Sequence, residues 1–184
     1  MRVIAGEFKS RSLLAPRGQS TRPTGDRVRE AIFSMLGAYF DGGKCLDLFA
    51  GSGALGIEAI SRGIELVVFV DRSSAGTVRE NLRSLGAQTR ARVLPVSHHA
   101  ALTRLGKEGA KFDLVFLDPP YGLGLLPQTM SILVERELLC AGAFVVAEMD
   151  ARTSVPEQPS LKLLREAVYG TVKVAIYTFG SQAG

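Results

Sequence analysis

The sequence predicts an α/β fold built on a mostly parallel β-sheet, and three observations lead to it. From residue 44 onward, short runs rich in β-branched residues alternate with helical patterns, as in repeated strand–helix units. The strand-like runs are continuously apolar, which is typical of strands that are covered on both faces. The first run is followed by a glycine-rich turn at residues 51–53, where a helix is expected to begin.

The elements of this part can be placed by their residue patterns. We expect strands near residues 44–49, 66–70, 91–96, 112–117 and 142–148. We expect the intervening helices near residues 53–63, 74–85, 99–108 and 126–137. Two further strand-like runs, 161–169 and 171–179, flank Gly170 and predict a hairpin with a tight turn. An antiparallel final strand is therefore expected to close the sheet.

The first 43 residues have a different character. Residues 3–9 and 12–14 are predicted to pair as a small hairpin, followed at 16–25 by a loop rich in turn formers. A helix is expected from about Asp26 to Tyr39, with one apolar face. We therefore divide the chain into an N-terminal extension, residues 1–43, and a larger domain, residues 44–184.

Composition limits the class of protein. The chain has 184 residues, of which 46% are hydrophobic, enough for one substantial core. Its two cysteines, Cys45 and Cys140, lie far apart without a nearby histidine cluster, so no zinc site or other metal site is expected. No apolar stretch approaches the roughly 20 residues of a membrane span, and the N-terminus lacks the apolar segment of a signal peptide. We expect a cytoplasmic protein.

Positive charge is concentrated at the N-terminal end. The net charge is +4. Residues 1–43 hold seven basic and four acidic side chains, whereas residues 44–184 hold fifteen basic and fourteen acidic ones. A basic arm on a nearly neutral domain is suited to binding a nucleic-acid backbone. An ordinary solvated surface is the alternative.

The glycine turn suggests a cofactor site. Gly51 and Gly53 lie where a helix N-terminus offers free N–H groups to a ligand. Asp71 closes the next strand, where a ribose-binding carboxylate is expected, although it could simply cap the following helix. Residues 51–56 also satisfy the G-x-G-x-x-G pattern of dinucleotide enzymes. Asp47 argues against a dinucleotide, because it would repel a pyrophosphate, whereas it could bind the amino-acid end of S-adenosylmethionine.

A second motif, Asp118-Pro119-Pro120-Tyr121, follows the strand-like run 112–117. An exocyclic amine of a nucleobase is a poor nucleophile, because its lone pair is delocalised into the ring. The Asp118 carboxylate and the Pro119 carbonyl could accept the amine hydrogens, held by a turn that two prolines stiffen. Tyr121 could stack on the base. The two motifs together predict an S-adenosylmethionine-dependent enzyme that methylates an exocyclic amino group.

Three strings carry a resemblance to a known family: T-R-P-T-G-D-R-V-R-E at 21–30, L-D-L-F-A-G-S-G-A-L-G at 46–56 and D-P-P-Y at 118–121. The chain resembles the RsmD-type bacterial methyltransferases, which modify guanine N2 of small-subunit ribosomal RNA. The resemblance covers essentially the whole chain. The R-P-T-x-D-R-V-R-E string is its specific part, since many amino-methyltransferases share the other two.

The resemblance implies a Rossmann-like class I S-adenosylmethionine methyltransferase sheet of seven strands, the last one antiparallel, with a small N-terminal hairpin-and-helix extension. It implies S-adenosylmethionine as cofactor, no metal, and 16S ribosomal RNA or a small-subunit assembly particle as partner of a monomeric protein. The catalytic residues would be Asp118, Pro119, Pro120 and Tyr121. The cofactor contacts would be Asp47, Phe49, Gly51, Ser52, Gly53, Asp71, Arg72, Ser97, His98 and Asp118. The RNA contacts would be Arg11, Arg22, Thr24, Arg27 and Arg29. For Arg27 and Arg29 the alternative is that the side chain braces the expected helix against the sheet.

One departure from the family concerns the adenine pocket. Such enzymes often present Asp or Asn after the third strand, where this chain has Ser97-His98-His99, so the adenine contacts stay open.

Three alternatives fit the residues less well. A DNA adenine-N6 or cytosine-N4 methyltransferase would need extra sequence to read and flip a base. A protein-glutamine methyltransferase would have Asn in place of Asp118. A non-catalytic RNA-binding module would not be expected to keep Asp47, Asp71 and Asp118 together.

Overall fold

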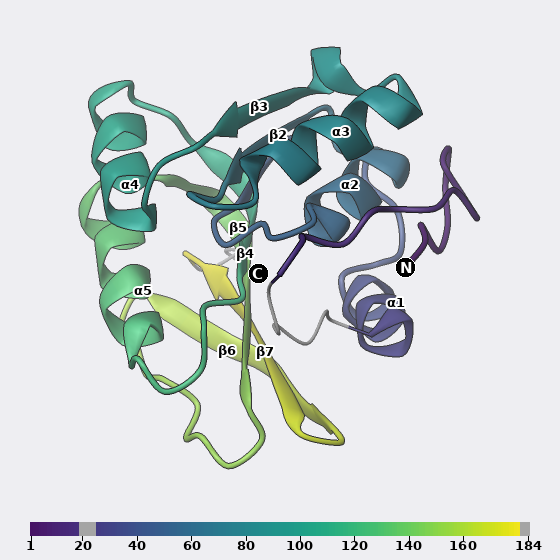
Figure 1. Ribbon diagram of the computed structural model, residues 1–184. Coiled ribbons are helices and arrows are strands. Elements are labelled where there is room, and N and C mark those ends of the chain that lie inside the picture. Colours follow the sequence, from purple (N-terminus) through teal and green to yellow (C-terminus); the bar gives the residue numbers. More distant parts are fainter. Residues whose placement is uncertain (19–24, 181–184) are drawn as a thin grey trace.

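The computed structural model describes residues 1–18 and 25–180, and this part of the chain forms one seven-stranded sheet in the order β3-β2-β1-β4-β5-β7-β6 (Figure 1). Strands β1 to β5 pair in parallel, while β7 runs antiparallel to both of its neighbours, β5 and β6. The predicted sheet, including its antiparallel last strand and the hairpin at Gly170, is confirmed. The strands are β1 (Lys44–Asp47), β2 (Leu66–Val70), β3 (Ala91–Leu94), β4 (Phe112–Leu117), β5 (Leu139–Asp150), β6 (Leu161–Tyr169) and β7 (Val172–Phe179).

Helices cover both faces of the sheet (Figure 1). They are α1 (Asp26–Met35), α2 (Ala54–Ser61), α3 (Ala75–Leu85), α4 (His98–Lys107) and α5 (Leu125–Glu135), with a short 3-10 helix at Gln88–Arg90. One apolar core joins α1, α2 and α3 to strand residues such as Cys45 and Phe69. A second core joins α4 and α5 to the alternate residues, such as Leu46 and Val68. Continuous apolar runs in the strands therefore supply both cores.

Two element boundaries differ from the prediction by three residues or more, while the other boundaries differ by at most two. Helix α1 ends at Met35 instead of continuing to Tyr39, because Gly37 and Ala38 adopt positive φ angles of 103° and 68°, which no helix continues through. Strand β5 begins at Leu139, before the expected residue 142. Its first residues lack strand-forming side chains, and they are held by pairing with β4 across an irregular register.

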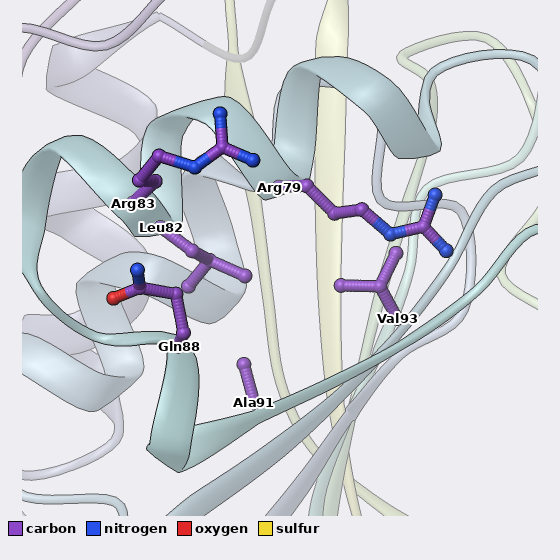
Figure 2. Close-up of a pocket in the computed structure, with 6 residues that line it drawn as sticks. All are labelled: Arg79, Leu82, Arg83, Gln88, Ala91 and Val93. Atoms are coloured by element: carbon purple, nitrogen blue, oxygen red, sulfur yellow. The ribbon is translucent and has the colours of Figure 1, made fainter.

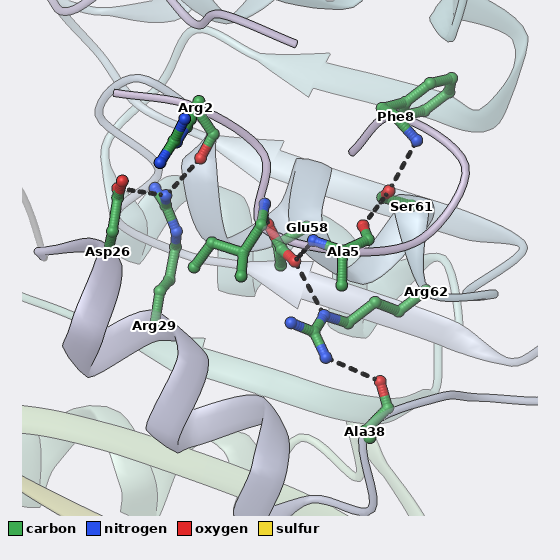
Figure 3. Close-up of polar contacts among 10 residues, drawn as sticks. Arg2, Ala5, Phe8, Asp26, Arg29, Ala38, Glu58, Ser61 and Arg62 are labelled. Carbon is green, nitrogen blue, oxygen red and sulfur yellow. Dashed lines mark hydrogen bonds and ion pairs between the residues drawn. The ribbon is translucent and has the colours of Figure 1, made fainter. Parts of the chain in front are cut away.

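The predicted N-terminal hairpin is reduced to one antiparallel bridge, between Arg2 and Ser12. Val3 still donates its N–H to the carbonyl oxygen of Arg11 at 2.9 Å, but the residues after it do not continue the strand, because several of their N–H groups have other partners. The N–H groups of Ile4 and Ala5 donate to the carboxylate of Glu58 on α2, at 2.8 and 3.0 Å (Figure 3). A side chain on a helix has thus replaced the partner strand.

The N-terminal segment is docked tightly on α2. At Gly6, where φ is +83°, a Cβ atom would lie 1.9 Å from the carbonyl oxygen of Ser61, so only glycine permits this approach. Val3, Phe8 and Leu13 belong to the same core as α1 and α2. In the described residues, the extension therefore has no core separate from the larger domain.

The helices are short in comparison with the thickness of a bilayer. Across residues 1–18 and 25–180, none of them combines the length and the apolar character needed to cross a membrane.

Candidate functional site

Three aspartates lie at the carboxyl ends of neighbouring strands. Asp47 ends β1 and is paired in register with Phe69 of β2 and Phe116 of β4. Asp71 and Asp118 each follow two residues after those partners. Since carboxyl ends of parallel strands meet at one edge of a sheet, the three carboxylates share this edge, which is where open α/β sheets bind ligands.

Asp47 is the buried member of this group, with 2% of its surface exposed. Its Oδ2 accepts a hydrogen bond from the N–H of Gly56 at 3.0 Å. The pKa of Asp47 is raised to about 7, chiefly by burial; the Gly56 bond opposes this rise, and the charges of Asp118 and Asp71 add to it. A cation placed beside Asp47 would favour its ionised form, so the site suits a positively charged ligand group.

Two glycines of the G-x-G-x-x-G string, Gly51 in the turn and Gly56 in α2, have separate functions. Gly51 has φ +55°, and a Cβ there would meet no atom within 4 Å, so this side of the turn is open to a ligand. At Gly56 a Cβ would lie 2.4 Å from Cε1 of Phe69. Gly56 therefore permits close packing of α2 on β2, whereas Gly51 leaves the backbone exposed for binding.

Asp71 connects this turn to the start of α3. Its Oδ2 accepts from the N–H of Gly51 at 2.9 Å, and its Oδ1 accepts from the N–H groups of Ser73 and Ser74 at 2.9 and 2.7 Å. Asp71 thus orders the turn that leads into α3, whose N-cap residue is Ser74, which is the structural alternative that the sequence left open. A carboxylate has about four acceptor positions, so a ribose contact stays a prediction. Arg72 lies beside it with an exposed side chain.

Two of the predicted cofactor contacts, Phe49 and His98, come together. The rings of Phe49 and His98 have centroids 5.1 Å apart and are tilted by 38°. Burial lowers the pKa of His98, and the charge of His99 acts in the same direction, which favours the neutral imidazole. The Ser97 hydroxyl accepts from the N–H of Ala100 at 3.2 Å and caps α4. The Ser52 hydroxyl is turned inward and accepts from the N–H of Ala54 at 3.3 Å.

The D-P-P-Y turn leaves one aromatic ring accessible. Pro119 is buried and Asp118 is half-buried. Tyr121 is 50% exposed, and the nearby Leu123 is 64% exposed. This part of the strand-end edge thus presents a carboxylate beside an apolar, partly aromatic surface, which is suited to a planar base. No group of three or more histidine, cysteine or acidic residues in the described chain is arranged to hold a metal ion.

The predicted RNA contacts fall into three groups. Arg11 and Arg27 are exposed, and Arg11 donates to the carbonyl oxygen of Ser84 at 2.6 Å. Arg22 and Thr24 lie outside the described residues. The RNA contact predicted for Arg29 must be corrected, because the side chain of Arg29 is 0% exposed.

Arg29 has a structural function instead. Its Nη2 donates to the carbonyl oxygen of Arg2 at 2.6 Å and to Oδ1 of Asp26 at 2.8 Å (Figure 3). Burial lowers the pKa of Arg29, which the charge of Asp26 opposes. The guanidinium thus fastens the first residues to α1 and cannot reach a phosphate.

Sequence reasoning missed Asn81, a buried residue of α3 that supports the site. Its amide donates to the carbonyl oxygen of Ser52 at 2.9 Å and to that of Leu14 at 3.0 Å, and it accepts from the N–H of Leu14 at 2.8 Å. Asn81 therefore links the N-terminal segment to the glycine turn. The helical spacing gives a signal for it, since Asn81 shares the apolar face of α3 with Val78 and Leu85.

A buried ion pair on α2 was also missed. Glu58 accepts from Nε of Arg62 at 2.8 Å, and Nη1 of Arg62 donates to the carbonyl oxygen of Ala38 at 3.0 Å (Figure 3). This pair joins α2 to the segment after α1.

Comparisons with known proteins agree with this geometry. The family model described as conserved hypothetical protein 95 matches residues 1–178. The YlbH protein of Bacillus subtilis is 47% identical over 180 residues, covering 96% of this chain and 98% of that protein. "Ribosomal RNA small subunit methyltransferase D" of Escherichia coli K12 is 37% identical over 181 residues, covering 96% and 89%. The solved structure of the yhhF protein of Escherichia coli has a TM-score of 0.84 at 36% identity, covering 99% of each chain.

Proposed function

This chain belongs to the conserved hypothetical protein 95 family, which contains the RsmD-type methyltransferases, and on that premise we propose that it methylates the N2 amine of a guanine in 16S ribosomal RNA during small-subunit maturation. The broader activity is methylation of ribosomal RNA with S-adenosylmethionine as donor. The observation that carries the finer proposal is the placement of Asp118 at the same sheet edge as Asp47, Asp71 and the open face of Gly51.

The residues at this edge fit S-adenosylmethionine. Asp47 and the turn at Gly51 would hold its methionine end, since a buried carboxylate suits a cation and the turn offers accessible backbone. Asp71 would accept the ribose hydroxyls, and the Phe49–His98 pair would contact the adenine. When bound, the cofactor supplies an electrophilic methyl group on its sulfonium.

Asp118 would activate the acceptor amine. Its carboxylate and the Pro119 carbonyl would accept the N2 hydrogens, which keeps electron density on nitrogen and stabilises the positive charge that develops there. Tyr121 would stack on the guanine and fix its plane. Positioning and electrostatics are then the main sources of rate acceleration.

We propose that residues 1–43 dock the RNA and that residues 44–184 carry the chemistry. The exposed Arg11 and Arg27 would bind phosphates, which holds the RNA in register without reading its sequence. Asn81 would couple the two parts, because it bonds both Leu14 and Ser52.

The test is methyl transfer by the purified protein. It would be incubated with tritiated S-adenosylmethionine and either free 16S ribosomal RNA or small-subunit assembly particles, and the RNA would then be digested to nucleosides. We expect label in N2-methylguanosine. Label confined to methyladenine or methylcytosine in added DNA would instead support the DNA methyltransferase alternative.

A further inference from the structure

A hollow of about 290 Å³ lies between α3 and β3, on the side of the sheet that is three strands away from β4 (Figure 2). Strand β3 is the outermost strand on this side of the sheet. Leu82, Ala91 and Val93 form the apolar part of the hollow, and its remaining lining residues are Arg79, Arg83 and Gln88. Ala91 is paired with Val67 near the start of β2, so the hollow extends toward the amino-terminal ends of the strands.

The two arginines have no evident structural function. Arg79 and Arg83 are exposed and lie one turn apart on α3, and within the described residues neither guanidinium has a hydrogen bond or ion pair. Like charges at this spacing destabilise a helix slightly. Glu80 lies three residues before Arg83, a spacing at which helical side chains can meet, but no ion pair joins the two within the described residues, and adjacent residues such as Arg79 and Glu80 do not face each other. The pair is therefore a local excess of positive charge beside an apolar hollow.

This charge adjoins the arm proposed to dock RNA. Arg11 of the arm donates to the carbonyl oxygen of Ser84, the residue after Arg83. Glu7, the acidic residue of the arm that precedes Arg11, is paired with Arg90 at 2.6 Å, so it does not neutralise the α3 arginines. Basic groups thus continue from the arm onto α3.

An apolar base-sized hollow with two guanidinium groups and one amide has the chemistry to bind a nucleotide. Guanidinium groups bind phosphates in bidentate fashion and stack on base planes. The Gln88 amide can both donate to and accept from a base edge. The volume is at the small end of ligand pockets, which suits one base. Building on the proposed function, we propose that this hollow binds one unpaired nucleotide of the RNA substrate and anchors the RNA at a second point, remote from the target guanine.

The first test removes the charge. Binding of a single-stranded oligoadenylate of about 12 nucleotides, within the range that binding grooves cover, would be measured by fluorescence anisotropy at several salt concentrations. We expect the double variant Arg79→Ala/Arg83→Ala to bind at least about tenfold more weakly, with a salt slope reduced by roughly 1.4, or about 0.7 for each phosphate that an arginine no longer neutralises. The matched control is Lys162→Ala/Arg165→Ala on β6, which removes two exposed cations from the opposite edge of the sheet. Equal reductions in both double variants would overturn the proposal.

The second test fills the hollow without changing charge. Ala91→Phe should weaken oligoadenylate binding while leaving the salt slope, the melting temperature and the binding of a fully paired RNA duplex unchanged. Wild-type oligoadenylate affinity in a folded Ala91→Phe protein would show that no base enters. Adenosine monophosphate that bound the hollow as tightly as the oligonucleotide would identify a free nucleotide as the ligand and also overturn the proposal.

Methylation kinetics separate this proposal from the proposed function. With 16S ribosomal RNA, the Arg79→Ala/Arg83→Ala variant should raise KM and keep kcat, because the hollow lies away from the reacting groups. If the wild-type protein did not methylate RNA at all, the proposed function would fail, while the binding comparison would still decide the hollow.

Discussion

The Asp71 carboxylate accepts a hydrogen bond from the N–H of Gly51 at 2.9 Å, which fastens the end of β2 to the turn after β1. The other carboxylate oxygen accepts from the N–H groups of Ser73 and Ser74, in the turn just before α3. One side chain therefore fixes two of the segments proposed to surround the cofactor. Ordering of the turn and binding of the ribose would depend on the same group.

Asp71→Ala should weaken S-adenosylmethionine binding by about 1.5–3 kcal/mol, the range for hydrogen bonds to a charged group. Asp71→Asn, which keeps one acceptor oxygen but no charge, should weaken it less. Isothermal calorimetry measures both, with thermal melting to confirm that each variant is folded. Unchanged affinity in both variants would mean that Asp71 is only a cap.

Asp118→Ala should lower the methyl-transfer rate by about 10²–10³, by analogy with the removal of one transition-state hydrogen-bonding partner. Cofactor affinity should stay close to the wild-type value, because the proposed function of Asp118 is on the acceptor amine. Single-turnover transfer and calorimetry on the same preparation separate these effects. Turnover near the wild-type rate would remove Asp118 from the mechanism.

The raised pKa of Asp47 predicts a pH-dependent stability. The folded protein keeps this proton up to about pH 7, whereas the unfolded chain releases it near the ordinary aspartate pKa of 3.8. Between these two pH values the folded state binds more protons, so stability falls as pH rises and becomes level above about pH 7. The full change is roughly 4 kcal/mol, at about 1.4 kcal/mol for each pKa unit.

Asp47→Asn should abolish this pH-dependent part of the free energy of unfolding. Without cofactor, the variant should be more stable than the wild-type protein at pH 8. Urea unfolding of both proteins from pH 4 to pH 8 measures the difference. Parallel stability curves over that range would contradict the raised pKa.

Arg27 and Arg29 form a matched pair on α1, one exposed and one buried. Arg27→Ala should weaken RNA binding and lower the salt slope by roughly 0.7–0.9, with stability within about 0.5 kcal/mol of wild type. Arg29→Ala should instead destabilise the fold by about 2–4 kcal/mol, because it removes a buried side chain and its hydrogen bonds. Its salt slope, measured on the folded fraction, should be unchanged. Reversed results for the two variants would mean that the arm binds RNA in another conformation.

The sequence predicted the sheet well because its strands are apolar throughout and are separated by clear helical patterns. It failed for the N-terminal hairpin, since the acceptor for Ile4 and Ala5 is Glu58, more than fifty residues away. For Arg29 it could not decide between an RNA contact and a brace for helix α1, because an arginine is expected at the surface unless its burial is known. Such long-range pairings have no local signal.

In the candidate site, too, features set by local sequence were predicted and features set by long-range packing were not. The glycines and the three aspartates were found from local patterns, because turns and strand ends impose them. Asn81 could have been found from its place on the apolar face of α3. Its hydrogen bonds to Leu14 and Ser52 could not have been predicted in this way. The hollow beside Ala91 exists only where α3 and β3 pack together, so no sequence pattern predicts it.

Mass spectrometry of 16S ribosomal RNA from cells that lack this protein tests the central claim most directly. Nucleosides would be compared between the deficient cells and the same cells supplied with the wild-type protein or with Asp118→Ala. The account predicts that one N2-methylguanine is missing and that only the wild-type protein restores it. An undiminished N2-methylguanine level in the deficient cells, or full restoration by Asp118→Ala, would contradict it.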